Sequence, residues 1–135
     1  MPLLIGIVLA GVVAVFARVV GFDRDKAFYP TVLIIVGAFY VLFAVMAGGG
    51  CGLVTELIGF ASFAGLAVWG FRTSLWIVAA GLAAHGAFDF VRHNWFPGPG
   101  APEWWPAFCG GYDVAAAIVL AAILINANRK AVSGR

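Results

Sequence analysis

Charged side chains are scarce in this sequence. Only 10% of its 135 residues are Asp, Glu, Lys or Arg, whereas 64% are hydrophobic. A soluble domain has about 25% charged residues, and a chain this apolar has too few polar groups to cover a surface in water. A net charge of only +2 with no basic stripe excludes the electrostatic surface of a nucleic-acid-binding protein. The composition therefore indicates a membrane protein, and the length indicates a single domain over residues 1–135.

The N-terminal segment also lacks the basic region that precedes the apolar core of a secretory signal. It is apolar from Pro2 onward. We therefore expect this segment to be retained as a membrane anchor.

Long apolar runs are what the chain has in abundance. About 20 apolar residues are needed for a helix to cross the hydrocarbon layer. The runs show no alternation of polar and apolar residues of the barrel type, and helices are then the only solution in lipid. The sequence predicts an all-α bundle of five transmembrane helices, with an outer loop at 94–111 and helices at 2–20, 30–47, 51–70, 74–93 and 113–128.

Small residues at four-residue spacing predict close helix packing, because they let backbones approach where no hydrophobic force acts between helices. The alternative is that alanine and glycine are simply common in this chain. The positions concerned are Gly6, Ala10 and Ala14; Ala61 and Gly65; Gly81 and His85; and Ala83 and Ala87.

The distribution of Lys and Arg predicts the orientation. If the N-terminus is outside, seven of the eight basic residues fall in cytoplasmic segments, and only Arg92 falls outside. Short cytoplasmic loops carry an excess of Lys and Arg. We therefore expect an N-out, C-in protein with several spans in the inner (cytoplasmic) membrane.

Ionisable residues gather in the outer half of this arrangement. At 1.5 Å per residue, Glu56 lies about 8 Å below the outer end of its helix, Asp89 about 6 Å and His85 about 12 Å. His85 and Asp89 share one stripe of a helix with Arg92 and His93. Ionisable residues at membrane depth usually face a bundle interior and indicate a functional site. Glu56, His85 and Asp89 are therefore the candidate catalytic residues.

Five further residues are candidate binding residues with ordinary alternatives. Arg92 and His93 lie near the interface, where long polar side chains extend to water. Asp113 could equally be the N-cap of the fifth helix. Trp104 and Trp105 fit the aromatic belt of a membrane interface, with stacking on a substrate as the alternative.

The same residues could bind a metal ion. His85 and His93 are about 12 Å apart along one helix, too far for one zinc ion with bonds near 2.1 Å. A mononuclear site would use His85 with Asp89, or Asp89 with His93, completed by Glu56 or Asp113. Such mixed nitrogen and oxygen ligation would suit zinc or iron.

Cysteine is present only twice, and Cys51 and Cys109 have no zinc-ribbon spacing. Both fall on the outer side of the predicted topology. A disulfide between them would be allowed in a periplasmic setting, and two free thiols are the alternative.

Three segments resemble an uncharacterised bacterial family of small polytopic membrane proteins, classed as a domain of unknown function. They are Ala27–Ile34, His85–Asp89, and Trp104–Cys109 followed by Tyr112 and Asp113. The resemblance covers most of the chain and implies a multi-helix membrane fold without a known activity.

Two functional families are weaker comparisons. The His-x-x-x-Asp element of His85 and Asp89 is similar to the His-x-x-x-Glu of emopamil-binding-type sterol isomerases, which shuttle protons with intramembrane groups. The alkaline ceramidase superfamily binds zinc in the membrane through three histidines, an aspartate and a serine. This chain has two histidines.

Three functions remain open from sequence. The first is an enzyme or binding protein for a lipid-soluble substrate, such as a lipid-modifying hydrolase or isomerase. The second is a small carrier of ions or solutes, and the third is a structural subunit of a membrane complex. Membrane lipids are the expected partners, and the sequence leaves a homo-oligomer open.

Overall fold

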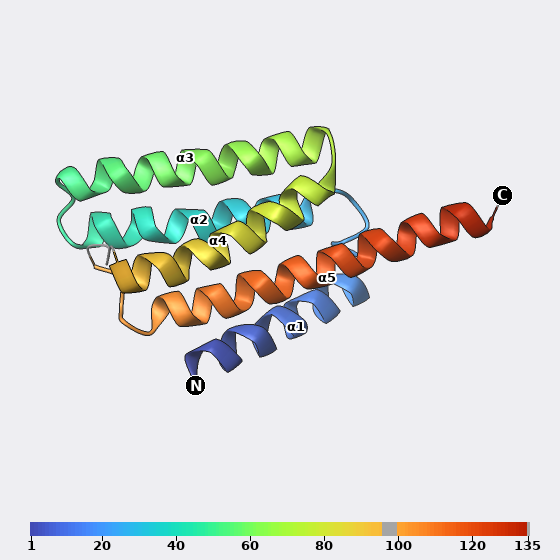
Figure 1. The fold of residues 1–135 in the computed structure, drawn as a ribbon, viewed down its shortest axis with the longest axis horizontal. Helices are drawn as coiled ribbons and strands as arrows, with labels where there is room; N and C mark the ends of the chain where they lie inside the picture. The colour runs from blue at the N-terminus through green and yellow to red at the C-terminus, as the bar shows by residue number, and fades with distance from the viewer. Residues whose placement is uncertain (96–99, 135) are drawn as a thin grey trace.

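The computed structural model describes residues 1–95 and 100–134, except for the side chain of His93. The predicted all-helical fold is confirmed, because the described residues form helices and turns and no strand. Each helix is long and apolar enough to cross a membrane. Figure 1 shows the five helices, α1 (Pro2–Val20), α2 (Phe28–Met46), α3 (Cys51–Arg72), α4 (Leu75–Trp95) and α5 (Trp105–Ser133).

The first four helices agree with the predicted bounds to within two residues at each end. The fifth does not, because α5 begins at Trp105, eight residues before Asp113, and continues to Ser133. Pro106 is well placed in its first turn. The prediction that Asp113 caps this helix is therefore wrong, since Asp113 lies in the third turn, and the predicted outer loop at 94–111 is correspondingly shorter.

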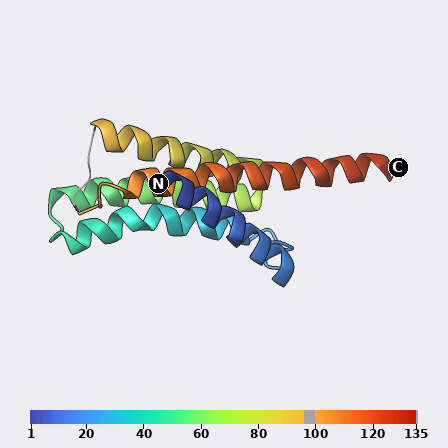
Figure 2. The same cartoon turned by 90° about the horizontal axis from the view of Figure 1, so that it is seen from below.

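Helix α5 is the centre of the arrangement. It packs against α1 on one side and α4 on the other, and α2 and α3 form a pair beyond α4. Among the described helices, α1 contacts only α5, and in Figure 2 the two axes diverge toward the C-terminal end of α1. The N-terminus lies at the end of the bundle where α2 is connected to α3, and the C-terminus lies at the opposite end (Figure 1).

The contact between α1 and α5 depends on glycine. A Cβ atom at Gly6 would overlap the backbone oxygen of Phe108, and one at Gly111 would meet the backbone oxygen of Leu3. Ala10, one turn after Gly6, is also buried. The predicted role of small residues in close packing is thus confirmed for this pair of helices.

The predicted role of small residues in close packing is also confirmed for one other set of positions and is wrong for two sets. Gly81 faces the side chain of Leu33 on α2, and His85, one turn later, is buried. The pairs Ala61 with Gly65 and Ala83 with Ala87 are exposed instead. The central core is apolar and joins α2, α4 and α5 through the fully buried side chains of Leu33, Val78, Leu82 and Leu120.

The glycine contact yields a test with a matched control. Gly6→Ala should lower the free energy of unfolding by about 2 kcal/mol, because overpacking typically costs about 1–3 kcal/mol. Gly11→Ala should have no such effect, since a Cβ at Gly11 meets nothing within 4 Å. Alanine is also the better helix former there. Thermal unfolding in detergent measures both changes, and equal stability of the two variants would contradict the described contact.

Candidate metal centre

The polar stripe of α4 faces the interior of the bundle. His85, Asp89 and Arg92 are 1%, 0% and 8% exposed, respectively. Such residues are expensive to bury without partners. The predicted inward orientation of the stripe is therefore confirmed, and Arg92 is not a residue that extends to the interface. The side chain of His93 lies outside the described part of the structure.

Helix α5 presents two more polar groups to this stripe. Cys109 and Asp113 are one helical turn apart, on one face, and both are buried. They meet α4 because the two backbones approach closely at a pair of glycines. A Cβ at Gly86 would lie 3.1 Å from the backbone oxygen of Gly110, and one at Gly110 would lie 3.2 Å from the backbone oxygen of Gly86.

The four side chains form a compact cluster. Each of His85, Asp89, Cys109 and Asp113 offers one potential ligand atom, and these atoms all lie within 4.8 Å of one another. His85 Nδ1 is 2.7 Å from Asp113 Oδ2 and 3.6 Å from Asp89 Oδ2. Cys109 Sγ donates to Asp113 Oδ2 over 3.6 Å. Nitrogen, oxygen and sulfur ligands thus converge on one buried point.

These separations are close to those of a metal site. Zinc bonds of about 2.0–2.3 Å in a tetrahedron place ligand atoms about 3.3–3.8 Å apart. The two separations of 3.6 Å satisfy that geometry. The shorter contact between His85 and Asp113 is a hydrogen bond, and it would have to lengthen by about 1 Å for both groups to bind one ion.

Helix α2 adds a fifth group to the cluster. The Tyr40 hydroxyl donates a hydrogen bond of 2.7 Å to Asp89 Oδ1. This bond fixes one oxygen of Asp89 and turns the other, Oδ2, toward His85. Tyr40 therefore acts as an outer support for a ligand, a role that such hydrogen bonds commonly have around metals.

Two carboxylate oxygens of the cluster have no hydrogen-bond partner within the described residues. They are Asp89 Oδ2 and Asp113 Oδ1. Buried carboxylate oxygens in proteins are nearly always hydrogen-bonded or bound to a cation. With both carboxyls ionised, even a protonated His85 leaves the cluster one positive charge short. A divalent cation would balance the two carboxylates with His85 neutral.

Glu56 is not part of this cluster, although the sequence grouped it with His85 and Asp89. It forms a buried ion pair with Arg92, which also stacks over the Tyr40 ring at 4.7 Å. The prediction that Glu56 could complete the metal site is not supported by this pairing, because its carboxylate is already neutralised. Asp113, the other predicted candidate, occupies that place.

The remaining candidates separate into exposed and buried residues. Trp104 is exposed, as a residue of an aromatic belt would be. Trp105 instead packs against α2, with ring centroids 4.8 Å from Phe39 and 4.9 Å from Phe43. Of the two alternatives for cysteine, the structure has free thiols, since Cys51 is exposed and Cys109 is buried. The disulfide is not formed.

Sequence reasoning missed two members of the site. The sequence indicates a disulfide or a free thiol for Cys109, although this residue precedes Asp113 by four positions and would share its face in a helix that starts at Trp105. Tyr40 carries no local signal, because its partner Asp89 is 49 positions away. Only tertiary packing brings those two side chains together.

The hydrogen bond from Tyr40 can be tested directly. Tyr40→Phe should destabilise the fold by about 1–3 kcal/mol, the usual effect of leaving a buried acceptor without its donor. Tyr112→Phe is the matched control, because its hydroxyl has no hydrogen bond within the described residues. Chemical unfolding in detergent compares the variants. A Tyr40→Phe protein as stable as the Tyr112→Phe protein would contradict the bond.

The comparisons with known proteins leave the site to be interpreted from its own geometry. No family model, no curated protein and no solved structure matches this chain. The resemblance to a family of unknown function therefore stays a prediction.

Proposed function

We propose that this chain is an integral membrane protein that binds one zinc ion between His85, Asp89, Cys109 and Asp113. The observation that carries the proposal is the convergence of four buried potential ligand atoms, two of them on carboxylates that each retain an unpartnered oxygen. Cysteine, histidine and aspartate together form a ligand set that zinc accepts. A cysteine sulfur, which binds metals as the thiolate, argues against magnesium and calcium, because these ions prefer oxygen.

The proposed chemistry is acid–base or hydrolytic catalysis on a lipid-soluble substrate. Zinc in a site with an open position acts as a Lewis acid and activates water. A water-sized cavity of about 10 Å³ lies beside the cluster, and its lining includes His85, Tyr40 and Phe63. Catalysis would require one of the four ligands to leave the ion, since zinc with four protein ligands is closed.

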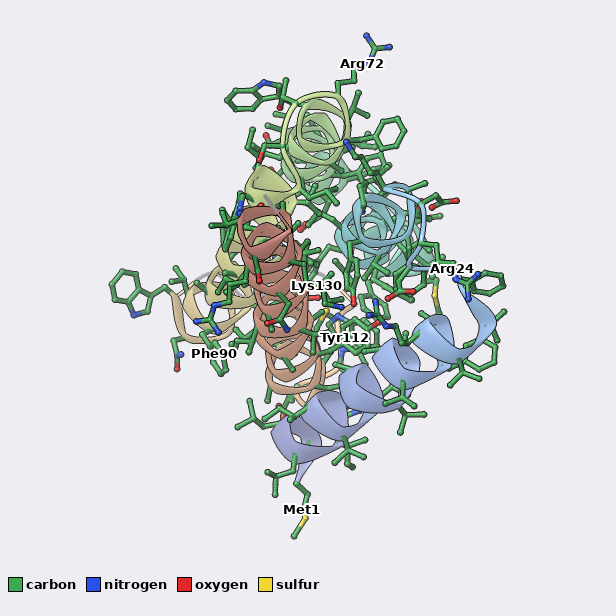
Figure 3. The ribbon with its side chains drawn as sticks, turned by 90° about the vertical axis from the view of Figure 1, so that its right-hand side faces the viewer. Met1, Arg24, Arg72, Phe90, Tyr112 and Lys130 are labelled. Carbon is green, nitrogen blue, oxygen red and sulfur yellow. The ribbon has the colours of Figure 1, made fainter. Side chains whose placement is uncertain are left out.

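We further propose that the protein spans the inner membrane with its N-terminus outside. The described basic residues support this orientation. Six of them lie at one end of the bundle, either near the α1–α2 and α3–α4 connections or in the C-terminal part of α5. They are Arg18, Arg24, Lys26, Arg72, Arg129 and Lys130. In Figure 3, which views this end, Arg72 and Arg24 lie at the edge of the bundle and Lys130 lies near the centre of the view. Such a basic end is typical of the cytoplasmic side.

Metal analysis tests the proposed site. Protein purified without added metal should contain about one zinc ion per chain. Asp89→Asn and Asp113→Asn should each lose most of this zinc, because each substitution removes one of the four proposed ligands. Glu56→Gln is the matched control, since Glu56 pairs with Arg92 and not with the cluster. A folded wild-type protein without metal would overturn the proposal, and loss of zinc in Glu56→Gln would overturn the ligand set. Iron in place of zinc would overturn the choice of ion alone.

Cysteine labelling tests the orientation. Cys51 is exposed at the start of α3, whereas Cys109 is buried. In intact cells, a membrane-impermeant maleimide should therefore label the wild-type protein at Cys51. A Cys51→Ser/Ser133→Cys variant should react only after the membrane is opened, because Ser133 ends α5 at the opposite end. The reverse pattern would show that the N-terminus is inside.

A further inference from the structure

An apolar groove runs between α3 and α4 on the outer surface of the bundle. Its volume is about 380 Å³, and Thr55, Ile58 and Val91 form its exposed rim. The floor carries two buried ionisable side chains, Glu56 and Arg92. In a bilayer this rim would face the acyl chains, so that the groove is open to lipid and closed to water.

The groove leads toward the metal cluster. Glu56, Gly59 and Phe88 line both the groove and the water-sized cavity that reaches His85. These three residues therefore form the wall between the membrane and the proposed zinc site. Gly59 leaves room in this wall, because a Cβ atom there would meet nothing within 4 Å.

Arg92 lines the groove and has an unused hydrogen-bond donor buried beneath its surface. One terminal nitrogen donates to Glu56, and the guanidinium is stacked over Tyr40 and Phe88. Its Nε has no hydrogen-bond partner within the described residues, although the side chain is only 9% exposed. A buried, fixed guanidinium N–H of this kind favours a ligand that supplies an oxygen acceptor.

The charges around Arg92 select the kind of acceptor. Glu56 already neutralises Arg92, and the two aspartates of the cluster lie beyond Tyr40. An anionic head group would be repelled by these carboxylates, and Arg92, already neutralised by Glu56, would not offset the cost of desolvating it. An uncharged oxygen, such as that of an alcohol, aldehyde or ester, meets the donor without that penalty.

We propose that the groove between α3 and α4 admits from the membrane an uncharged lipophile with one terminal oxygen, which accepts a hydrogen bond from the guanidinium of Arg92. The apolar tail would lie along the rim at Ile58 and Val91, and the polar end would lie beside the cavity at His85. This inference rests on the proposed function for the reaction that follows, but binding depends only on the groove and Arg92.

Photolabelling in lipid nanodiscs tests the groove. The probe is hexadecanol with a diazirine in its chain and a terminal alkyne, and its cross-links are mapped by mass spectrometry. We expect labelling within segments 51–59 and 88–92, displaced by hexadecanol but not by palmitate or hexadecane. Gly59→Leu should reduce labelling at least about tenfold, because its side chain fills the groove. Gly65→Leu is the matched control on the same helix, where a Cβ also meets nothing within 4 Å.

A second variant tests the donor. The double variant Glu56→Gln/Arg92→Met removes the guanidinium without leaving an unpaired charge. Hexadecanol should then displace the probe about tenfold more weakly, which is the effect expected from losing one hydrogen bond to a charged group. Hexadecane should then compete equally with hexadecanol.

Three results would overturn the inference. They are labelling outside the two segments, equal labelling of Gly59→Leu and Gly65→Leu, and displacement of the probe from the wild type by palmitate or hexadecane as well as by hexadecanol. Zinc content is measured on the same samples. Groove labelling in protein without zinc would overturn the proposed function and support the groove inference. Bound zinc without groove labelling would support the proposed function and overturn the groove inference.

Discussion

The contact between His85 and Asp113 is the interaction on which the rest of the site depends. It joins α4 to α5 by a hydrogen bond of 2.7 Å in a place that is fully buried. In such surroundings an imidazole or a carboxylate without a partner would be costly, so each side chain requires the other. The approach of Gly86 to Gly110 makes the contact possible, because any larger residue would separate the two backbones. Cys109 and Asp89 are then brought within reach by helical geometry alone.

Two polar groups with different charge balance lie side by side in the bundle. Glu56 and Arg92 neutralise each other, whereas the cluster of His85, Asp89, Cys109 and Asp113 has more acidic than basic groups. Tyr40 connects the two, since its hydroxyl bonds Asp89 and its ring lies under Arg92. A single aromatic side chain thus contacts both polar groups.

Helix number and most helix bounds follow from the sequence, because hydrocarbon thickness sets the length of an apolar run. The start of α5 does not, since Gly110 and Gly111 resemble a break until the neighbouring backbones of α4 and α1 are known. That single shift moves Asp113 from a helix end to the interior. Depth along the axis singles out His85 and Asp89, which are both buried, but it could not assign their partners. Glu56 lies near the same depth, and only the rotation of α3 about its axis directs it to Arg92.

The packing of α1 has a consequence for the biosynthesis of the chain. Helix α1 leaves the ribosome first, yet α5, the only described helix that it contacts, is made last. Until α5 is synthesised, α1 has no described helix to pack against, whereas α2, α3 and α4 can already associate through their own contacts. The cluster is completed at the same late moment, because α5 also supplies Cys109 and Asp113. Docking of the final helix thus closes both the bundle and the site in one step.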